Sequence, residues 1–185
     1  MEGVLPRTMD GSARNTRFPT ASDVAAVISA LKSAKSKPTG EELYAILVAL
    51  ANAAVDRLEP SKALAFAVGA EALNSELPQA YNAAGRAHAS TKNYPGAVEC
   101  YEAALRLNRN QVYINNLEPI AKLYPSEPDF WIAARTLAPD KPQQVLESLP
   151  PEKQQIVRDF LAAQRARKLI GAFNKNQPLP ETAAS

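Results

Sequence analysis

Few side chains in this sequence are suited to catalysis or metal binding, and they stand apart from one another. The chain has one histidine, His88, and one cysteine, Cys100, among 185 residues. Cys100 has no basic neighbour in the sequence that would lower the pKa of its thiol, and it is interpreted as a buried packing residue. His88 is interpreted as a packing residue as well. Glu99 and Glu102 are interpreted as solvated residues of a helix surface, not as a general acid–base pair. We therefore predict that the protein is not an enzyme and uses no cofactor or metal.

Composition and charge are those of an ordinary soluble domain. Hydrophobic residues make up 46% of the chain, charged residues 22%, and the net charge is +2. This overall charge does not favour nucleic acid or an anionic membrane as a partner. The longest apolar stretch, residues 43–55, is shorter than the roughly 20 residues that a membrane span requires. The N-terminus also lacks the apolar run of a secretory signal, so we expect a cytoplasmic protein without a membrane span.

The spacing of apolar residues predicts a chain built only of α-helices. No segment alternates apolar and polar residues convincingly over the length of a strand. Short turns between the helices predict that helices adjacent in the sequence pack antiparallel. In the third helix we expect Leu64, Val68 and Leu73 to face inward. The predicted helices cover residues 22–35, 41–58, 61–74, 78–90, 95–107, 111–123, 126–139, 141–149 and 150–173.

Small residues and aromatic rings recur at fixed positions between residues 81 and 108. We expect Gly85 and Ala97 to lie where two helices cross most closely, because a larger side chain would force the helices apart. The pattern resembles the tetratricopeptide (TPR) repeat, a helix–turn–helix unit of about 34 residues. Ala84, His88 and Arg109 depart from the residues usual in that family. The matching positions are Tyr81, Gly85, Tyr94, Ala97, Tyr101, Ala104 and Leu105.

The resemblance extends to neighbouring segments and implies a fold. Residues 41–74 resemble a degenerate repeat, and Tyr81–Pro128 resembles the last repeat plus capping helix of small glutamine-rich TPR co-chaperones. The implied fold is all-α, a short TPR-like solenoid of antiparallel helix pairs with additional C-terminal helices. The chain is expected to divide into a disordered tail (1–20), helical repeats with a capping helix (21–125), a C-terminal helical extension (126–173) and a second disordered tail (174–185).

The resemblance also implies a protein that binds other proteins. Many co-chaperones of the family hold the chaperone C-terminus in a clamp of basic residues, but Gln79 and Ala83 occupy positions where that clamp has Lys and Arg. We expect an adaptor or co-chaperone-like module that binds a protein or peptide segment on its concave surface, without a clamp and without a small-molecule substrate. The predicted contacts on this surface are Gln79, Asn82, Arg86 and Ser90.

The C-terminal part of the chain contains further candidate contacts. Arg165, Arg167 and Lys168 give the last helix a basic face, opposite an apolar one. This helix packs back on the repeats with a solvated basic face, which we favour, or docks on an acidic partner or RNA, or lies on a membrane surface. Trp131 either caps the hydrophobic end of the array or, exposed together with Phe130, anchors a partner.

Two alternative functions remain open at this point. The first is a chaperone for a secreted protein, resembling the small TPR chaperones of type III secretion. The second is a structural subunit of a large assembly, such as a ribonucleoprotein particle, docked through the basic C-terminal helix. In the second case binding would weaken steeply with salt, because it would depend on charge.

Overall fold

The computed structural model describes residues 38–181, and every regular element in this range is an α-helix. This confirms the predicted all-α class for the described part of the chain. The predicted helix over residues 22–35 and the predicted N-terminal tail lie outside the described residues. The elements are α2 (Gly40–Asp56), α3 (Pro60–Leu73), α4 (Pro78–Ser90), α5 (Tyr94–Leu107), α6 (Gln111–Ala121), α7 (Asp129–Leu137), α8 (Pro142–Ser148) and α9 (Pro151–Asn174).

Local sequence chemistry explains where these helices begin. The side chain of Thr39 accepts a hydrogen bond from the backbone N–H of Glu42, whose carboxylate accepts one from the Thr39 N–H, forming a capping box at α2. Asn93 and Asn110 cap α5 and α6 through their side-chain oxygens. Proline stands in the first turn of α3, α4, α8 and α9, where a missing N–H costs no helical hydrogen bond.

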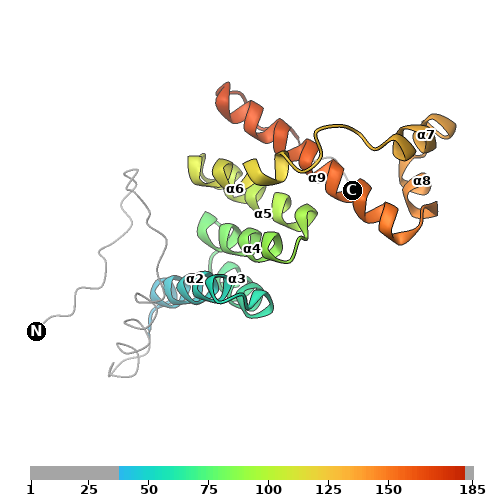
Figure 1. The fold of residues 1–185 in the computed structure, drawn as a ribbon. Helices are drawn as coiled ribbons and strands as arrows, with labels where there is room; N and C mark the ends of the chain where they lie inside the picture. Colours follow the sequence, from blue (N-terminus) through green and yellow to red (C-terminus); the bar gives the residue numbers. More distant parts are fainter. Residues whose placement is uncertain (1–37, 182–185) are drawn as a thin grey trace, which may run out of the picture.

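The helices are arranged as a stack of three helical pairs (Figure 1). α2 packs on α3, α4 on α5, and α6 on α9. Successive pairs contact each other through α2 and α4, α3 and α4, α5 and α6, and α5 and α9. α7 and α8 are inserted in the chain between α6 and α9, and they form a small lobe beside the stack (Figure 1).

The pairing of α6 with α9 differs from the predicted organisation. The sequence predicted a capping helix at α6 and a separate C-terminal extension from residue 126. Instead, Ile114 and Leu117 of α6 share one core with Leu105 of α5 and with Ala166 and Leu169 of α9. Antiparallel packing was expected between helices adjacent in sequence, whereas α6 packs on α5 and also on α9, which follows α7 and α8 in the chain. The favoured expectation that the last helix packs back on the preceding helices is confirmed, but its basic face is not simply solvated, because Arg165 pairs with Glu102 of α5.

A close helix crossing lies where the small residues predicted it. A Cβ atom added to Gly85 of α4 would lie 2.6 Å from Cε1 of Tyr101 in α5, well inside van der Waals contact. Tyr101 is 1% exposed, and Ala97 on the same helix is fully buried. The glycine is therefore needed for α4 to rest on the Tyr101 ring.

α3 packs through alanine and not through its larger apolar residues. Val68 and Leu73, which were predicted to face inward, are 61% and 43% exposed. Ala63, Ala67 and Ala70 are buried instead. α3 is rich in apolar residues on all sides, so its apolar spacing does not select a face. Close packing between helices then favours the side with the smallest side chains.

The C-terminal segment up to residue 181 is packed on the stack, which corrects the predicted disordered tail for these residues. Nη2 of Arg106 and Nη2 of Arg165 donate to the carbonyl oxygen of Pro180 at 2.6 and 2.9 Å. Arg109 donates to the carbonyl of Gln177 at 2.7 Å. Leu179 packs against the core shared by α5, α6 and α9. Arginines on α5, on α9 and in the turn between α5 and α6 therefore hold this segment through its backbone.

Ending the chain after Asn176 is expected to lower the free energy of unfolding by about 1–2 kcal/mol. The truncation removes charge-assisted hydrogen bonds and the contact of Leu179, while it releases the entropy of a short ordered segment. Urea unfolding monitored by circular dichroism measures the change. The full-length variant Leu179→Ser isolates the apolar part of this effect. Equal stabilities of the full and shortened chains would contradict the prediction.

Candidate interaction surface

Polar side chains bridge the first helices of the three pairs. Nη1 of Arg86 in α4 donates to Oδ1 of Asn52 in α2, and its Nη2 lies 2.7 Å from Oδ1 of Asp56. On the other side of α4, Nδ2 of Asn116 in α6 donates to Oδ1 of Asn82 at 2.9 Å. The bonds Asn52–Arg86 and Asn82–Asn116 each join residues 34 positions apart. The two bonds therefore join successive helical pairs at the same sequence separation.

This arrangement changes the interpretation of two predicted groove residues. Asn82 is completely buried and does not line an open surface, which corrects its predicted exposure. Its Nδ2 has no hydrogen-bond partner among the described residues. The side chain of Arg86 is 27% exposed and already pairs with Asp56. The exposure of both side chains was predicted from the sequence of α4 alone. In the structure, α2 and α6 lie on either side of α4 and contact these two residues.

The other two predicted groove residues, Gln79 and Ser90, lie near the two ends of α4. The hydroxyl of Tyr44 donates to Oε1 of Gln79 at 3.3 Å and accepts from the N–H of Ala80 at 3.2 Å. Burial raises the pKa of Tyr44 to about 12, so this phenol stays protonated at neutral pH. Ser90 is exposed, and its hydroxyl donates to the carbonyl of Ala87 at 2.7 Å. Gln79 is half-buried, so Ser90 is the most accessible of the predicted residues on this face.

Trp131 is a core residue of the α7–α8 lobe. Its side chain is 4% exposed and forms a cluster with Leu146 of α8 and with Val157 and Phe160 of α9. The structure thus corrects the prediction of an exposed Trp131 anchor. The lone tryptophan attaches the lobe to the first half of α9, because it fills the space between the three helices.

The predicted basic face of α9 is divided among different roles. Arg165 pairs with the carboxylate of Glu102 in α5, with Nε 2.8 Å from Oε2. Nη1 of Arg167 donates to the backbone carbonyls of Ala121 and Tyr124, at 3.0 and 2.7 Å, where α6 ends. Lys168 is exposed. Only one of the three predicted basic contacts is thus fully available to a partner.

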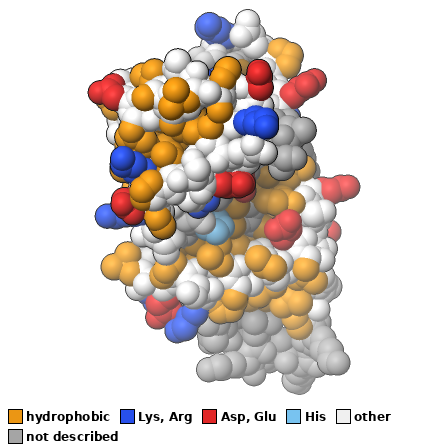
Figure 2. Space-filling view, turned by 90° about the vertical axis from the view of Figure 1, so that its right-hand side faces the viewer, with side chains coloured by type: hydrophobic (Ala, Val, Ile, Leu, Met, Phe, Trp, Pro, Cys, Tyr) orange, Lys and Arg blue, Asp and Glu red, His pale blue; other side chains and the backbone are white. Residues whose placement is uncertain are grey.

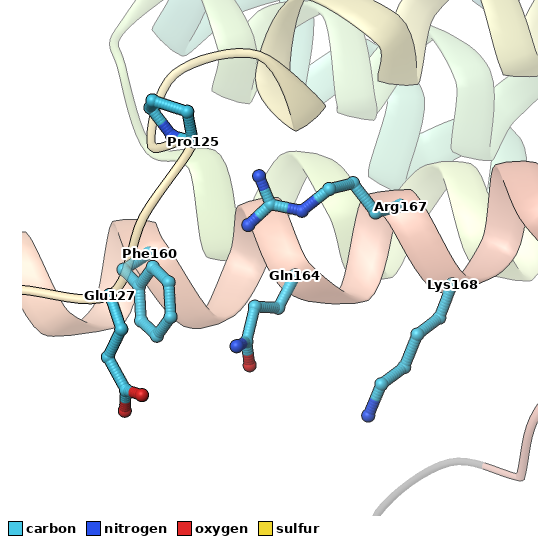
Figure 3. Close-up of a pocket in the computed structure, with 6 residues that line it drawn as sticks. All are labelled: Pro125, Glu127, Phe160, Gln164, Arg167 and Lys168. Atoms are coloured by element: carbon cyan, nitrogen blue, oxygen red, sulfur yellow. The ribbon is translucent and has the colours of Figure 1, made fainter. Parts of the chain in front are cut away.

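A shallow pocket of about 430 Å³ lies beside these residues. Figure 3 shows the side chains of Glu127, Gln164 and Lys168 extending to the same open side of α9, whereas Arg167 turns back toward the loop that contains Pro125. The pocket therefore presents one cation, one carboxylate and one amide to its open side. Glu127 also pairs with Arg135 at 3.0 Å, which reduces the charge it offers to a ligand.

Glu102 is not the solvated residue that the sequence predicted. It is 5% exposed, and both Arg165 and Arg106 donate to its carboxylate. Burial alone would raise the pKa of Glu102, but the hydrogen bonds and charges of the two arginines outweigh it, so the pKa lies below the usual value. Glu102 joins α5 to α9 as a buried ion pair, and its partner lies 63 residues away in the sequence.

Cys100 and His88 have different surroundings in the structure. Burial raises the pKa of the Cys100 thiol to about 11, with the Glu99 carboxylate adding to the shift. His88 contacts Asn93, with 3.0 Å between Nδ1 and Nδ2. Within residues 38–181, no three His, Cys, Asp or Glu side chains gather in a way that could hold a metal ion.

Comparisons with known proteins do not extend this picture. No family model, curated protein or solved structure matches the chain. In the described part of the chain, no helix combines the length and apolar character needed to cross a bilayer.

Figure 2 shows one face of the molecule, on which Lys and Arg side chains are interspersed with Asp and Glu and with hydrophobic patches. The described residues on this face form no large area of a single charge.

The sequence reasoning missed the partners of the predicted residues. Asn52, Asp56 and Asn116 were not singled out, although each contacts a predicted residue on α4. The length of the TPR repeat could have identified two of these partners. Asn52 lies 34 residues before Arg86, and Asn116 lies 34 residues after Asn82. A search for polar residues at that spacing would have predicted interhelical contacts instead of an open groove.

Proposed function

We propose that this protein is a TPR-type interaction module that binds a segment of another protein. The observation that carries the proposal is the 34-residue spacing of the two polar bridges across α2, α4 and α6. This spacing equals the length of a TPR unit, in which each repeat contacts its neighbours in register. The close contact of α4 with the Tyr101 ring at Gly85 supports the same assignment.

The proposed binding face is formed by the exposed parts of α2 and α4. Ser90 is exposed, the Asp56 side chain is 51% exposed, and the charge of Asp56 is balanced by Arg86. A face whose fixed charges are already paired attracts a partner through shape, apolar contact and backbone hydrogen bonds more than through charge. Binding should therefore change little between low and moderate salt, in contrast to RNA binding.

Site-specific photocrosslinking tests this proposal. With a benzophenone amino acid at Ser90, we expect a discrete crosslinked protein from the native cell, identified by mass spectrometry. Glu99, exposed on α5 of the same helical pair, is the matched control position and should give no such product. The proposal fails if both positions capture the same proteins, or if the Ser90 product disappears with a modest rise in salt.

The alternative functions have weaker support. A docking helix in a ribonucleoprotein particle would need free cations on α9, but Arg165 pairs with Glu102 and Arg167 binds carbonyls at the end of α6. For a type III secretion chaperone, no contact in the described residues distinguishes it from a general TPR adaptor. We therefore retain the adaptor as the proposed function.

A further inference from the structure

A second pocket lies where three distant parts of the chain meet. It has a volume of about 640 Å³, within the range of roughly 300–1,000 Å³ usual for ligand sites. The turn between α4 and α5, the end of α6 and the first half of α9 form its walls. Tyr94 belongs to the core of the stack and Tyr124 to the core of the α7–α8 lobe, so the pocket lies between these two cores. Its wall includes Lys92, Tyr94, Leu123, Tyr124, Gln155 and Asp159.

Asp159 places a buried carboxylate in this pocket. It is 8% exposed, and its Oδ1 accepts a hydrogen bond from Nε2 of Gln155 at 2.8 Å. None of the ion pairs within residues 38–181 includes Asp159. Burying a carboxylate without a counterion is costly. Burial accordingly raises the pKa of Asp159, although the hydrogen bond from Gln155 opposes the shift.

The cations next to Asp159 in the sequence are engaged elsewhere. Arg158 donates to the side chain of Gln154 at 3.1 Å. The ammonium group of Lys153 lies 5.3 Å from the centre of the Phe130 ring, in a cation–π contact. Lys92 is on the pocket wall, but none of the ion pairs among the described residues joins it to Asp159. The negative charge of Asp159 is therefore available to a positive group that enters from outside.

The remaining wall of the pocket suits such a group. Tyrosine rings attract cations over their faces, and a carboxylate next to them adds charge and a hydrogen-bond acceptor. We propose that this pocket binds the cationic side chain of a Lys or Arg from a protein partner. Thr91, Lys92 and Asn93 are exposed at the edge of the pocket, so a partner backbone can lie across them while its side chain reaches Asp159. The proposal takes from the proposed function only that the partner is a protein.

Titration of the ¹⁵N-labelled full chain with Nα-acetyl-arginine amide and Nα-acetyl-lysine amide, followed by NMR, tests the proposal. We expect saturable shift changes at the amides of Tyr94, Tyr124 and Asp159. Nα-acetyl-citrulline amide, a neutral near-isostere of the arginine probe, should bind at least tenfold more weakly. Equal binding of the citrulline probe, or shift changes confined to other regions, would overturn the proposal. This result is independent of crosslinking at Ser90, so the two proposals fail separately.

Two variants of opposite expected effect sharpen the test. Asp159→Asn keeps the shape of the side chain and should weaken binding of both cationic probes at least tenfold. Lys92→Gln removes a like charge from the wall and should tighten binding severalfold, which a merely structural role of Asp159 would not predict. Circular dichroism verifies that both variants are folded. Unchanged or weaker binding in Lys92→Gln, or unchanged binding in Asp159→Asn, contradicts the proposal.

Tighter binding of n-butylamine than of both amino-acid probes would identify a free amine as the ligand and overturn the assignment to a partner side chain.

Discussion

Glu102→Ala is expected to lower the free energy of unfolding by about 3–5 kcal/mol, the usual cost of removing one partner of a buried ion pair. The substitution leaves Arg165 and Arg106 facing a space that Glu102 now fills at 5% exposure. It also breaks the connection of α5 to α9. Equilibrium urea unfolding measures the loss.

The matched control is Glu118→Ala on α6. Glu118 lies 3.6 Å from Lys122, and both side chains are largely exposed, so its loss should cost less than about 1 kcal/mol.

Acid titration adds a second readout. The pKa of Glu102 is lowered in the folded state, so its contribution is present above its unfolded-state pKa and is lost as the pH falls through its lower folded-state pKa. Glu102→Gln should therefore lose less stability than the natural chain as the pH falls below about 4.5. Equal costs for Glu102→Ala and Glu118→Ala would contradict this account.

Gly85→Leu is expected to destabilise the protein by about 3 kcal/mol or more. The new Cβ would lie 2.6 Å from a ring atom of Tyr101, and this ring is 1% exposed and has no room to retreat. Overpacking of a buried crossing costs about 1–3 kcal/mol for small additions, and leucine adds several atoms. For a chain of this length the melting temperature should fall by roughly 6–12 °C, measured by circular dichroism.

Gly171→Ala in α9 is the control for this prediction. A Cβ at Gly171 meets no other atom within 4 Å, so only the backbone effect of the substitution remains. Alanine is favoured over glycine inside a helix by about 1 kcal/mol, and the control should therefore raise the melting temperature. If Gly85→Leu melts at the temperature of the natural chain, the tight crossing of α4 and α5 does not exist in solution.

The sequence was sufficient to predict most of the helices and one crossing. Proline and the capping side chains mark helix starts directly, and the predicted helix over residues 78–90 coincides with α4. Gly85 was predicted at the close contact because only small residues permit one. These are local signals, since the residues that produce them lie within one helix or one turn of each other.

The remaining features depend on residues far apart in the sequence. Glu102 has the sequence context of a surface residue, and only its partner Arg165, 63 positions later, explains its burial. Asn82 appeared to face a groove until α6 supplied Asn116. Val68 and Leu73 were predicted to face inward because they are large apolar residues, but α3 packs on its neighbours through its alanines. In each case a neighbouring helix determined which side chains are buried. The position of that helix could not be predicted from the residues around the side chain in the sequence.

The separation of α6 from α9 has a consequence for how the chain folds during synthesis. The first two helical pairs are complete once residue 107 has left the ribosome, but α6 must wait for α9, which begins at Pro151. Until then the apolar side of α6, including Ile114 and Leu117, lacks its partner. Such an interval exposes apolar surface that chaperones recognise or that aggregates. A nonsense mutation anywhere in the α7–α8 lobe should therefore yield a product that is cleared by proteolysis, even though both early helical pairs are intact.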